Sequence, residues 1–405
     1  LPLLFATALT VSVGCSTEPA DAPTSADASA TTDAASGADS GANAETSETT
    51  QAGDTTQGNT ADTGAGSNGA PYGVGVFTVQ TKGAAGRILP TEIWYPIPAA
   101  TKGTPTKYLQ GLVTSPYGAI RDAVAAKGKF PVVAFSHGNQ GVRDQSVFLT
   151  EGLARQGYVV VSPAHVGNTA LDFDDKLSGV MSLWRPQDLK AAIDRVENTL
   201  DSDPSWLKGL ADTSKVAVTG HSFGGYTTLA VAGIAVDVPE AVSVNCDNRP
   251  KQDPLCVEQA KLGSPPWDFG DPRVKVAIPL AHAFYAYNVL THASAKKLKV
   301  PTIIMAATGD KLTPYAAEAA PLYKDMTAPR ALFAIEGGGH MSFANICAVA
   351  AFVPANLKAE VEVLCGKDAD PTMAETHAAI LKYALAAVDI YLKGNDASRA
   401  LFKDK

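Results

Sequence analysis

Short, uninterrupted runs of apolar residues recur along most of this chain and constrain its fold more than any other feature. Val132-Val133-Ala134-Phe135 is one example. A strand buried on both faces shows such a run, and the strands of parallel sheets are buried in this way because helices cover both faces. Eight runs with strand composition are present, over residues 75–80, 92–97, 131–136, 158–163, 215–219, 274–280, 302–307 and 331–335.

Helical periodicity lies between the later runs. Apolar residues recur at three- and four-residue spacing over residues 144–156, 186–200, 223–235, 315–327 and 374–393. Because strands and helices alternate from Pro131 onward, we predict an α/β fold with one doubly wound, mostly parallel, eight-stranded sheet. The first two runs are expected to form its antiparallel edge, and residues 71–405 to form one domain.

The N-terminal part has a different composition. Residues 1–13 are almost wholly apolar or small and precede Gly14-Cys15, which indicates the remnant of an export signal over residues 1–15. The position of Cys15 is similar to the lipidated cysteine of bacterial lipoproteins, although Ser12 replaces the usual branched aliphatic residue; a plain secretory signal is the alternative. Residues 16–70 are rich in Ala, Thr, Ser, Gly and Asp and predict a disordered tether. We therefore expect an exported bacterial protein, either secreted or held at the cell envelope as a lipoprotein.

The charge distribution limits the partners. The formal net charge is −8, but residues 1–81 hold nine acidic residues and no Lys or Arg, so the remainder is close to neutral. No basic run is interleaved with aromatic residues, which argues against nucleic acid as a partner. Contact with a membrane is expected only through a lipid on Cys15, because no other segment approaches the roughly 18 apolar residues of a membrane span. The oligomeric state is not indicated.

Four further cysteines form two pairs that are close in the sequence, Cys246 with Cys256 and Cys347 with Cys365. In an oxidising compartment we expect two local disulfides, with other pairings or free thiols as alternatives. No Cys-x-x-Cys is present, so zinc is not expected. The first pair lies in a proline-rich segment, residues 237–272, which we interpret as a disulfide-stapled excursion beside the active site or as a decorated surface loop.

The apolar run at residues 215–219 leads directly into Gly220-His221-Ser222-Phe223-Gly224, and a helical pattern follows. A nucleophile between strand and helix needs a sharp turn, and glycines two residues before and after it permit one. The hydroxyl is then exposed at a helix N-terminus, where the free N–H groups and the helix dipole favour an oxyanion. We predict that Ser222 is a nucleophile.

A serine nucleophile needs a base, and the base needs an acid that orients it. His340 follows the final predicted strand in a glycine-rich loop, and Asp310 ends the strand before it. Both residues and Ser222 follow the carboxyl ends of parallel strands, which meet at one edge of the sheet. We predict a catalytic triad of Ser222, Asp310 and His340, without a cofactor.

Two N–H groups are expected to bind the oxyanion, those of Asn139 in the loop after the third core strand and of Phe223 after the nucleophile. Other residues also follow strand ends and are candidates to line a substrate pocket: His165, Asn168, His282 and Phe284. The alternative for each is a place in the core. A metal site built from His137, His165 and His282 is not expected, because no ligand spacing such as H-E-x-x-H is present.

The motifs Phe135-Ser136-His137-Gly138 and Gly220-His221-Ser222-Phe223-Gly224-Gly225, with Gly309-Asp310 and His340, resemble a group of bacterial α/β-hydrolases. The group comprises platelet-activating-factor acetylhydrolases, cutinase-like polyester hydrolases and predicted dienelactone hydrolases, and the likeness extends over about residues 72–395. It implies the α/β-hydrolase fold, a serine esterase, and oxyanion donors at Asn139 and Phe223. It also extends to Trp184-Arg185-Pro186-Gln187-Asp188 at the start of a helix and to Asp271-Pro272-Arg273-Val274-Lys275 at the start of a strand, both expected to be structural.

Two positions depart from this group. Dienelactone hydrolases use a Cys nucleophile, whereas this chain has Ser222; polyester hydrolases usually have Met after the nucleophile and Trp after the sixth strand, where this chain has Phe223 and, nearby, His282. We therefore predict hydrolysis of carboxylic esters, with short to medium acyl groups as the first expectation and polyesters as a second class. The alternatives are an amidase or peptidase that uses the same triad, and a non-catalytic surface binding protein on a hydrolase scaffold.

Overall fold

The computed structural model describes residues 71–238, 246, 250, 252–346 and 373–402. The predicted signal over residues 1–15 and the tether over residues 16–70 lie outside these residues. So do Cys15, Cys347 and Cys365, and the predictions made for them remain predictions.

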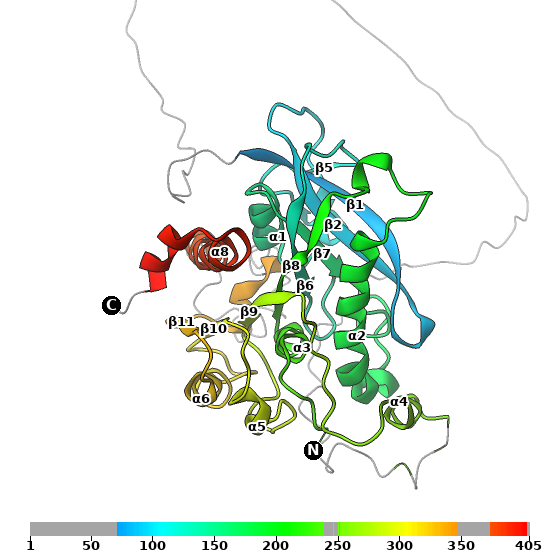
Figure 1. Cartoon of the computed structure of the whole chain (residues 1–405), viewed down its shortest axis with the longest axis vertical. Helices are drawn as coiled ribbons and strands as arrows, with labels where there is room; N and C mark the ends of the chain where they lie inside the picture. Colours follow the sequence, from blue (N-terminus) through cyan, green and yellow to red (C-terminus); the bar gives the residue numbers. More distant parts are fainter. Residues whose placement is uncertain (1–70, 239–245, 247–249, 251, 347–372, 403–405) are drawn as a thin grey trace, which may run out of the picture. The chain divides into compact units, whose positions relative to one another are not determined.

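A nine-stranded sheet forms the centre of the domain, in the order β11-β10-β9-β8-β6-β7-β2-β1-β5 (Figure 1). The strands from β6 to β11 run parallel, and β2 joins β7 in the antiparallel sense to start the predicted edge. The bounds are β1 (Tyr72–Lys82), β2 (Ile88–Pro98), β5 (Ile120–Arg121), β6 (Phe130–Ser136), β7 (Val159–Pro163), β8 (Ala211–His221), β9 (Val274–Leu280), β10 (Thr302–Ala307) and β11 (Arg330–Ile335).

All eight predicted strands are present, and the α/β prediction is confirmed. The predicted count was wrong by one, because β5 adds a ninth strand of only two residues beside β1. A separate hairpin of β3 (Lys107–Tyr108) and β4 (Val113–Thr114) was also not predicted. Segments this short are held by their neighbours and carry no periodicity of their own.

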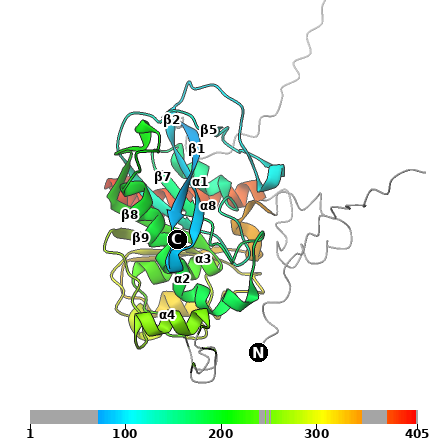
Figure 2. The same ribbon diagram turned by 90° about the vertical axis from the view of Figure 1, so that its right-hand side faces the viewer.

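Helices cover both faces of the sheet (Figures 1 and 2). One face packs against α2 (Ser178–Glu197), α3 (Phe223–Ala232), α5 (His292–Ala295) and α6 (Ala319–Asp325), and α4 (Pro254–Leu262) lies on α2. The other face packs against α1 (Val147–Ala154) and α8 (Met373–Val388), which a π-helical turn continues over Asp389–Lys393. Short 3-10 turns lie at Ala84–Gly86, Leu109–Gly111, Asp175–Leu177, Ser205–Leu207, His340–Phe343 and Asp396–Phe402.

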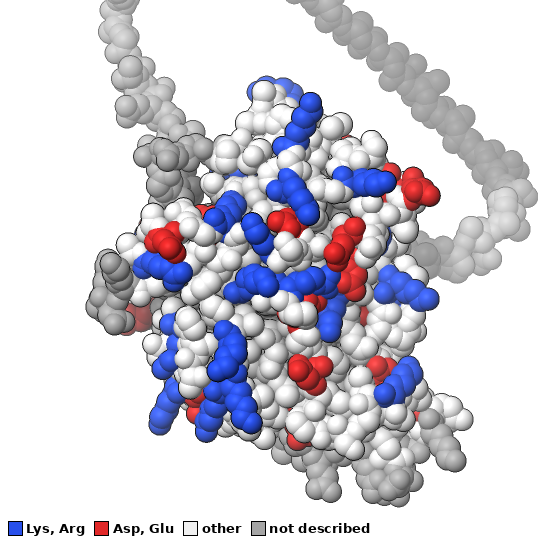
Figure 3. All heavy atoms as spheres, in the orientation of Figure 1, with Lys and Arg blue, Asp and Glu red and all other residues white. Residues whose placement is uncertain are grey.

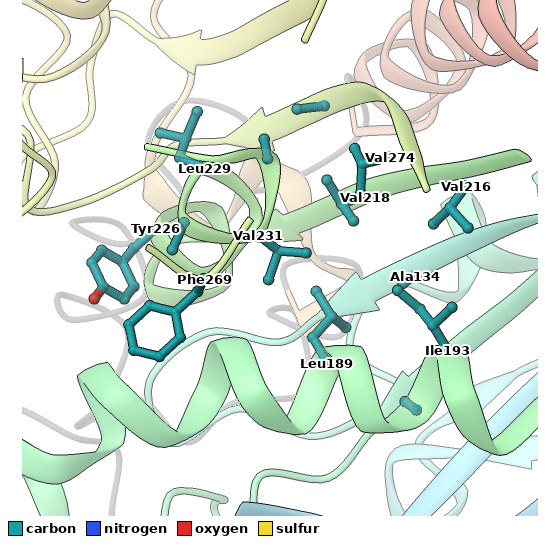
Figure 4. Close-up of a cluster of buried hydrophobic side chains, with 14 of the residues drawn as sticks. Ala134, Leu189, Ile193, Val216, Val218, Tyr226, Leu229, Val231, Phe269 and Val274 are labelled. Atoms are coloured by element: carbon teal, nitrogen blue, oxygen red, sulfur yellow. The ribbon is translucent and has the colours of Figure 1, made fainter. Parts of the chain in front are cut away.

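The core explains why the strand runs lack polar alternation. Along β6, Val132 and Ala134 pack on the side of α2, whereas Val133 and Phe135 pack on the side of α1. Figure 4 shows part of the first side, where Leu189 and Ile193 of α2 lie over residues of β6 and β8. Both faces of each central strand are therefore buried.

The predicted start of the helix at Pro186 was wrong, because α2 begins at Ser178 and Pro186 lies inside it. Proline has no N–H to donate to the carbonyl four residues earlier, that of Ser182. The Tyr226 hydroxyl donates to this carbonyl instead, at 2.9 Å. A contact between two helices thus compensates for the missing bond, and the Trp184–Asp188 motif lies within the helix.

Within residues 237–272, the disulfide between Cys246 and Cys256 is present, as predicted. The helix α4 was not predicted, although Asp253 caps it by accepting from the Leu255 N–H, and proline at position 254 suits a first helical turn. Trp184 Nε1 donates to Glu258 Oε2 at 3.1 Å, so α4 packs on α2. The described part of the excursion therefore supports α2.

Figure 3 shows Lys and Arg interspersed with Asp and Glu across much of one face. Among the described residues, no helix has the length and apolar character needed to cross a membrane.

One carboxyl group is buried among uncharged hydrogen-bond donors. Glu151 of α1 has no exposed surface, and its Oε2 accepts from Ser115 Oγ at 2.7 Å and from the Tyr117 N–H at 3.1 Å. Burial raises the pKa of Glu151 to about 7. The folded state therefore favours the protonated carboxyl.

This makes stability depend on pH. The pKa of Glu151 is about 7 in the folded state and about 4.3 in the unfolded state. The contribution of this carboxyl to stability is therefore complete below pH ~4 and is lost as the pH rises through 7. Glu151→Gln cannot ionise. The free energy of unfolding of the variant minus that of wild type should therefore be roughly 2–4 kcal/mol more positive at pH 8 than at pH 4. Urea unfolding of both proteins at both pH values measures this, and an equal difference at the two pH values would contradict it.

Candidate active site

Ser222 occupies a sharp turn between β8 and α3. Its backbone has φ 59° and ψ −117°, a conformation uncommon for a residue with a side chain, and its N–H donates to the Leu280 carbonyl at 2.9 Å. The side chain is half-buried, while His221 and Phe223 on either side are buried. The turn therefore raises Ser222 above its neighbours, as expected for a nucleophile.

The glycines of the motif are required by close backbone packing. A Cβ at Gly220 would lie 2.5 Å from the Gly224 carbonyl oxygen and 2.6 Å from that of Ser136. A Cβ at Gly224 would overlap the Ser136 carbonyl outright. The first turn of α3 thus lies directly against the end of β6, which no larger residue would permit.

Asp310 and His340 meet beside this edge, although 30 residues separate them in the chain. Asp310 Oδ2 lies 2.7 Å from His340 Nδ1, and both side chains are almost fully buried. Asp310 Oδ1 accepts from the backbone N–H groups of Leu312 and Thr313, and Thr313 Oγ1 lies 2.7 Å from Oδ2. The carboxylate is therefore fixed in position by three donors besides the imidazole.

These contacts also set the charge of the pair. Burial alone would raise the pKa of Asp310, but the hydrogen bond and charge of His340 and the bonds from Thr313 hold it below its ordinary value. An ionised Asp310 accepts a hydrogen bond from the N–H at Nδ1 of the imidazole, which leaves Nε2 unprotonated and able to act as the base.

His221 and Gln145 join the three loops of the site. Gln145 Nε2 donates to His221 Nδ1 at 2.9 Å, and His221 Nε2 lies 2.8 Å from the His340 carbonyl oxygen, to which it must donate. Gln145 Oε1 accepts from the Gly138 N–H at 3.0 Å, and the Gln145 carbonyl accepts from the Asn345 N–H at 2.7 Å. Burial lowers the pKa of His221 to about 3, so this histidine is neutral and structural.

Asn139 lies in a tight turn after β6. The Gly141 N–H donates to the Gly138 carbonyl at 3.1 Å, which makes Asn139 the second residue of the turn and leaves its N–H out of the turn's own bond. Phe223 is the first residue of α3, and first-turn N–H groups have no acceptor within a helix. The structure thus places both predicted donors at the carboxyl edge of the sheet.

The four predicted pocket residues differ in their surroundings. His165 is fully buried between Ser136 Oγ at 2.9 Å and Asp188 Oδ2 at 3.0 Å, and Asn168 is fully buried between Asn139 and Arg185. His282 is also buried, next to Gly225. These three offer no surface to a ligand, so the burial favours the alternative of a place in the core.

Phe284 is half-buried, and its ring contacts the ring of Phe223 edge-on at 5.3 Å. It is therefore the one predicted pocket residue that lies next to the turn of the nucleophile with part of its surface open.

Sequence reasoning missed the roles of Gln145, His221 and Arg185. Gln145 carried no signal, and His221 was noted only as part of the motif around Ser222. Arg185 was expected to be structural, but its guanidinium lies against the turn that contains Asn139. The sequence contained no signal for this position of Arg185, because the predicted helix began after it, at Pro186.

Parts of this chain are similar in sequence to known proteins. The chlorophyllase family model matches residues 112–244. Cutinase est2 of Thermobifida alba is 24% identical over 215 residues, which is 53% of each chain. Platelet-activating factor acetylhydrolase of Gallus gallus is 29% identical over 169 residues, 30% of this chain and 40% of its own length. The chain thus spans about half the length, or less, of these curated relatives.

A solved structure has a similar fold. A ferulic acid esterase from Streptomyces cinnamoneus superimposes with a TM-score of 0.56 over 85% of this chain and 96% of its own, at 20% sequence identity. The resemblance predicted from the motifs is confirmed: the chain has the α/β-hydrolase fold and is similar in sequence to cutinases and platelet-activating factor acetylhydrolase.

Proposed function

We propose that this protein is a carboxylic ester hydrolase that forms an acyl-enzyme on Ser222. The observation that carries the proposal is the buried pair of Asp310 and His340, with 2.7 Å between Oδ2 and Nδ1, at the sheet edge where Ser222 ends β8. The similarity to cutinases supports the same bond class.

In the proposed reaction, His340 Nε2 takes the proton of Ser222 as Oγ adds to the ester carbonyl. The N–H groups of Asn139 and Phe223 bind the oxyanion, and Asp310 stabilises the imidazolium. Collapse of the tetrahedral intermediate expels the alcohol, which receives the proton from His340. Water then attacks the acyl-enzyme by the same steps, which releases the acid and restores Ser222. No cofactor takes part.

The substrate is proposed to be an ester with a short to medium acyl group, and polyesters are a second candidate class. The partly open ring of Phe284 beside Phe223 supports an apolar group next to the scissile bond. The same triad would also cleave amides, so an anilide belongs in any substrate test.

We further propose that the protein is exported and that Cys15 carries a lipid. The almost wholly apolar residues 1–13 before Gly14-Cys15 support this proposal.

The proposal is tested with p-nitrophenyl esters from acetate to palmitate, a polyester film and p-nitroanilides. We expect wild type to hydrolyse the short esters, and Ser222→Ala to lose at least about 10³-fold in kcat/KM because no nucleophile remains. Ser182→Ala, in the partly buried part of α2, is the matched control and should retain wild-type rates. Equal rates for wild type and Ser222→Ala would refute the proposed nucleophile, and faster cleavage of anilides than of esters would reassign the substrate class.

Asp310→Asn tests the orientation of the base. The amide NH2 would donate to Nδ1, whereas the carboxylate accepts a hydrogen bond from it, so the imidazole is held in the wrong tautomer, and kcat on a short ester should fall by roughly 10³–10⁴-fold. Asp325→Asn is the matched control, because Asp325 lies 3.7 Å from His292 but outside the proposed triad. A loss of similar size in both variants would show that Asp310 has no specific role.

A further inference from the structure

Arg185 is a fully buried cation in α2. The hydrogen bonds that the structure gives its guanidinium go to uncharged acceptors: the Asn168 Oδ1, the His137 carbonyl, Ser136 Oγ and Thr227 Oγ1. The nearby carboxylate of Asp188 is taken instead by Arg87, at 2.7 and 2.8 Å, and by His165. Burial lowers the pKa of Arg185 to about 9, which still leaves it positively charged at neutral pH.

One side of the guanidinium holds the turn that contains Asn139. Arg185 donates directly to the His137 carbonyl, which belongs to the peptide bond before Gly138. It also donates to Asn168 Oδ1, and Asn168 Nδ2 donates in turn to Asn139 Oδ1 at 2.8 Å. The turn is thus fixed at its start by Arg185 and at Asn139 by an amide that Arg185 orients.

The other side of the guanidinium holds the start of α3. Its central carbon lies 4.5 Å from the centre of the Phe223 ring, within the range of a cation–π contact. Its Nε also lies 3.4 Å from Thr227 Oγ1, and that hydroxyl donates to the Phe223 carbonyl at 2.9 Å. Arg185 therefore contacts the turn through a backbone carbonyl and the start of α3 through two side chains.

We propose that Arg185 is the positioning residue of the oxyanion hole: it sets the N–H of Asn139 and the N–H of Phe223 at a fixed separation, and its positive charge favours the oxyanion between them. This inference rests on the proposed function. Charge in a water-excluded site acts strongly on a developing anion, and small shifts of aligned donors reduce rates steeply. A guanidinium suits this task because its planar fork reaches several acceptors at once, which an ammonium does not.

Arg87 provides a matched control in the same polar network. It pairs with Asp188, donates to the Val166 carbonyl at 2.8 Å and stacks on Trp184 at 4.5 Å. These contacts stabilise the fold without touching Asn139 or Phe223. Loss of Arg87 should therefore reduce stability but leave the oxyanion donors in place.

The experiment measures kcat, KM and thermal unfolding for Arg185→Lys, Asn168→Asp and Arg87→Lys with p-nitrophenyl butyrate. Arg185→Lys should lower kcat by about 10- to 100-fold with KM within about threefold, because the donors act mainly in the transition state. Asn168→Asp should lower kcat by about tenfold or more, since it pairs with the Arg185 charge and no longer donates to Asn139. Arg87→Lys should retain kcat within about twofold even where its melting temperature falls.

Two outcomes would overturn the inference. One is a wild-type kcat in Asn168→Asp. This substitution keeps the size of the side chain, so its kcat tests the inference even if Arg185→Lys does not fold. The other is a loss of kcat in Arg87→Lys equal to that in Arg185→Lys. Both outcomes leave the proposed function intact as long as wild type hydrolyses the ester and Ser222→Ala does not. An inactive wild type would refute the proposed function itself.

Discussion

The close approach of α3 to the end of β6 is the constraint on which the rest of the site depends. Gly224 lies so near the Ser136 carbonyl that no side chain fits between them, and Ser222 is held at positive φ where β8 turns into α3. This packing brings the start of α3 next to the turn after β6. Two loops that could supply oxyanion donors, and the serine between them, are thereby positioned by backbone contact before any side chain contributes.

Side chains then hold the remaining loops to this centre through two buried polar networks. Gln145 and His221 connect the turn after β6 to the backbone of His340. Arg185 and Asn168 connect the same turn to α2 and α3. The hydrogen bonds of these networks compensate for the desolvation of the neutral His221 and the charged Arg185, which therefore remain buried. Rigid support of this kind is what preorganised catalysis requires.

Much of the fold and the position of the proposed triad could be predicted from the sequence, because both depend on local sequence patterns. Continuous apolar runs marked the parallel strands, and Ser222, Asp310 and His340 were assigned to one sheet edge because each follows a strand end. The parts that were missed depend on contacts between distant segments. The sequence pattern predicts a helix start at Pro186, but the Tyr226 hydroxyl allows α2 to continue through this residue. The proposed role of Arg185 depends on the direction in which its side chain leaves α2 toward the turn after β6 and the start of α3. The spacing of residues in the sequence does not show this direction. His165, Asn168 and His282 follow strand ends as predicted, yet their side chains are buried.

The central claim is that Ser222 is the activated nucleophile of this edge. Its most direct test is to treat the folded protein with a fluorophosphonate and to locate the adduct by peptide mass spectrometry. A single adduct on the peptide that contains Ser222, strongly reduced in Asp310→Asn, is the predicted result. An adduct on another serine, or no adduct on a protein that hydrolyses esters, would contradict the account.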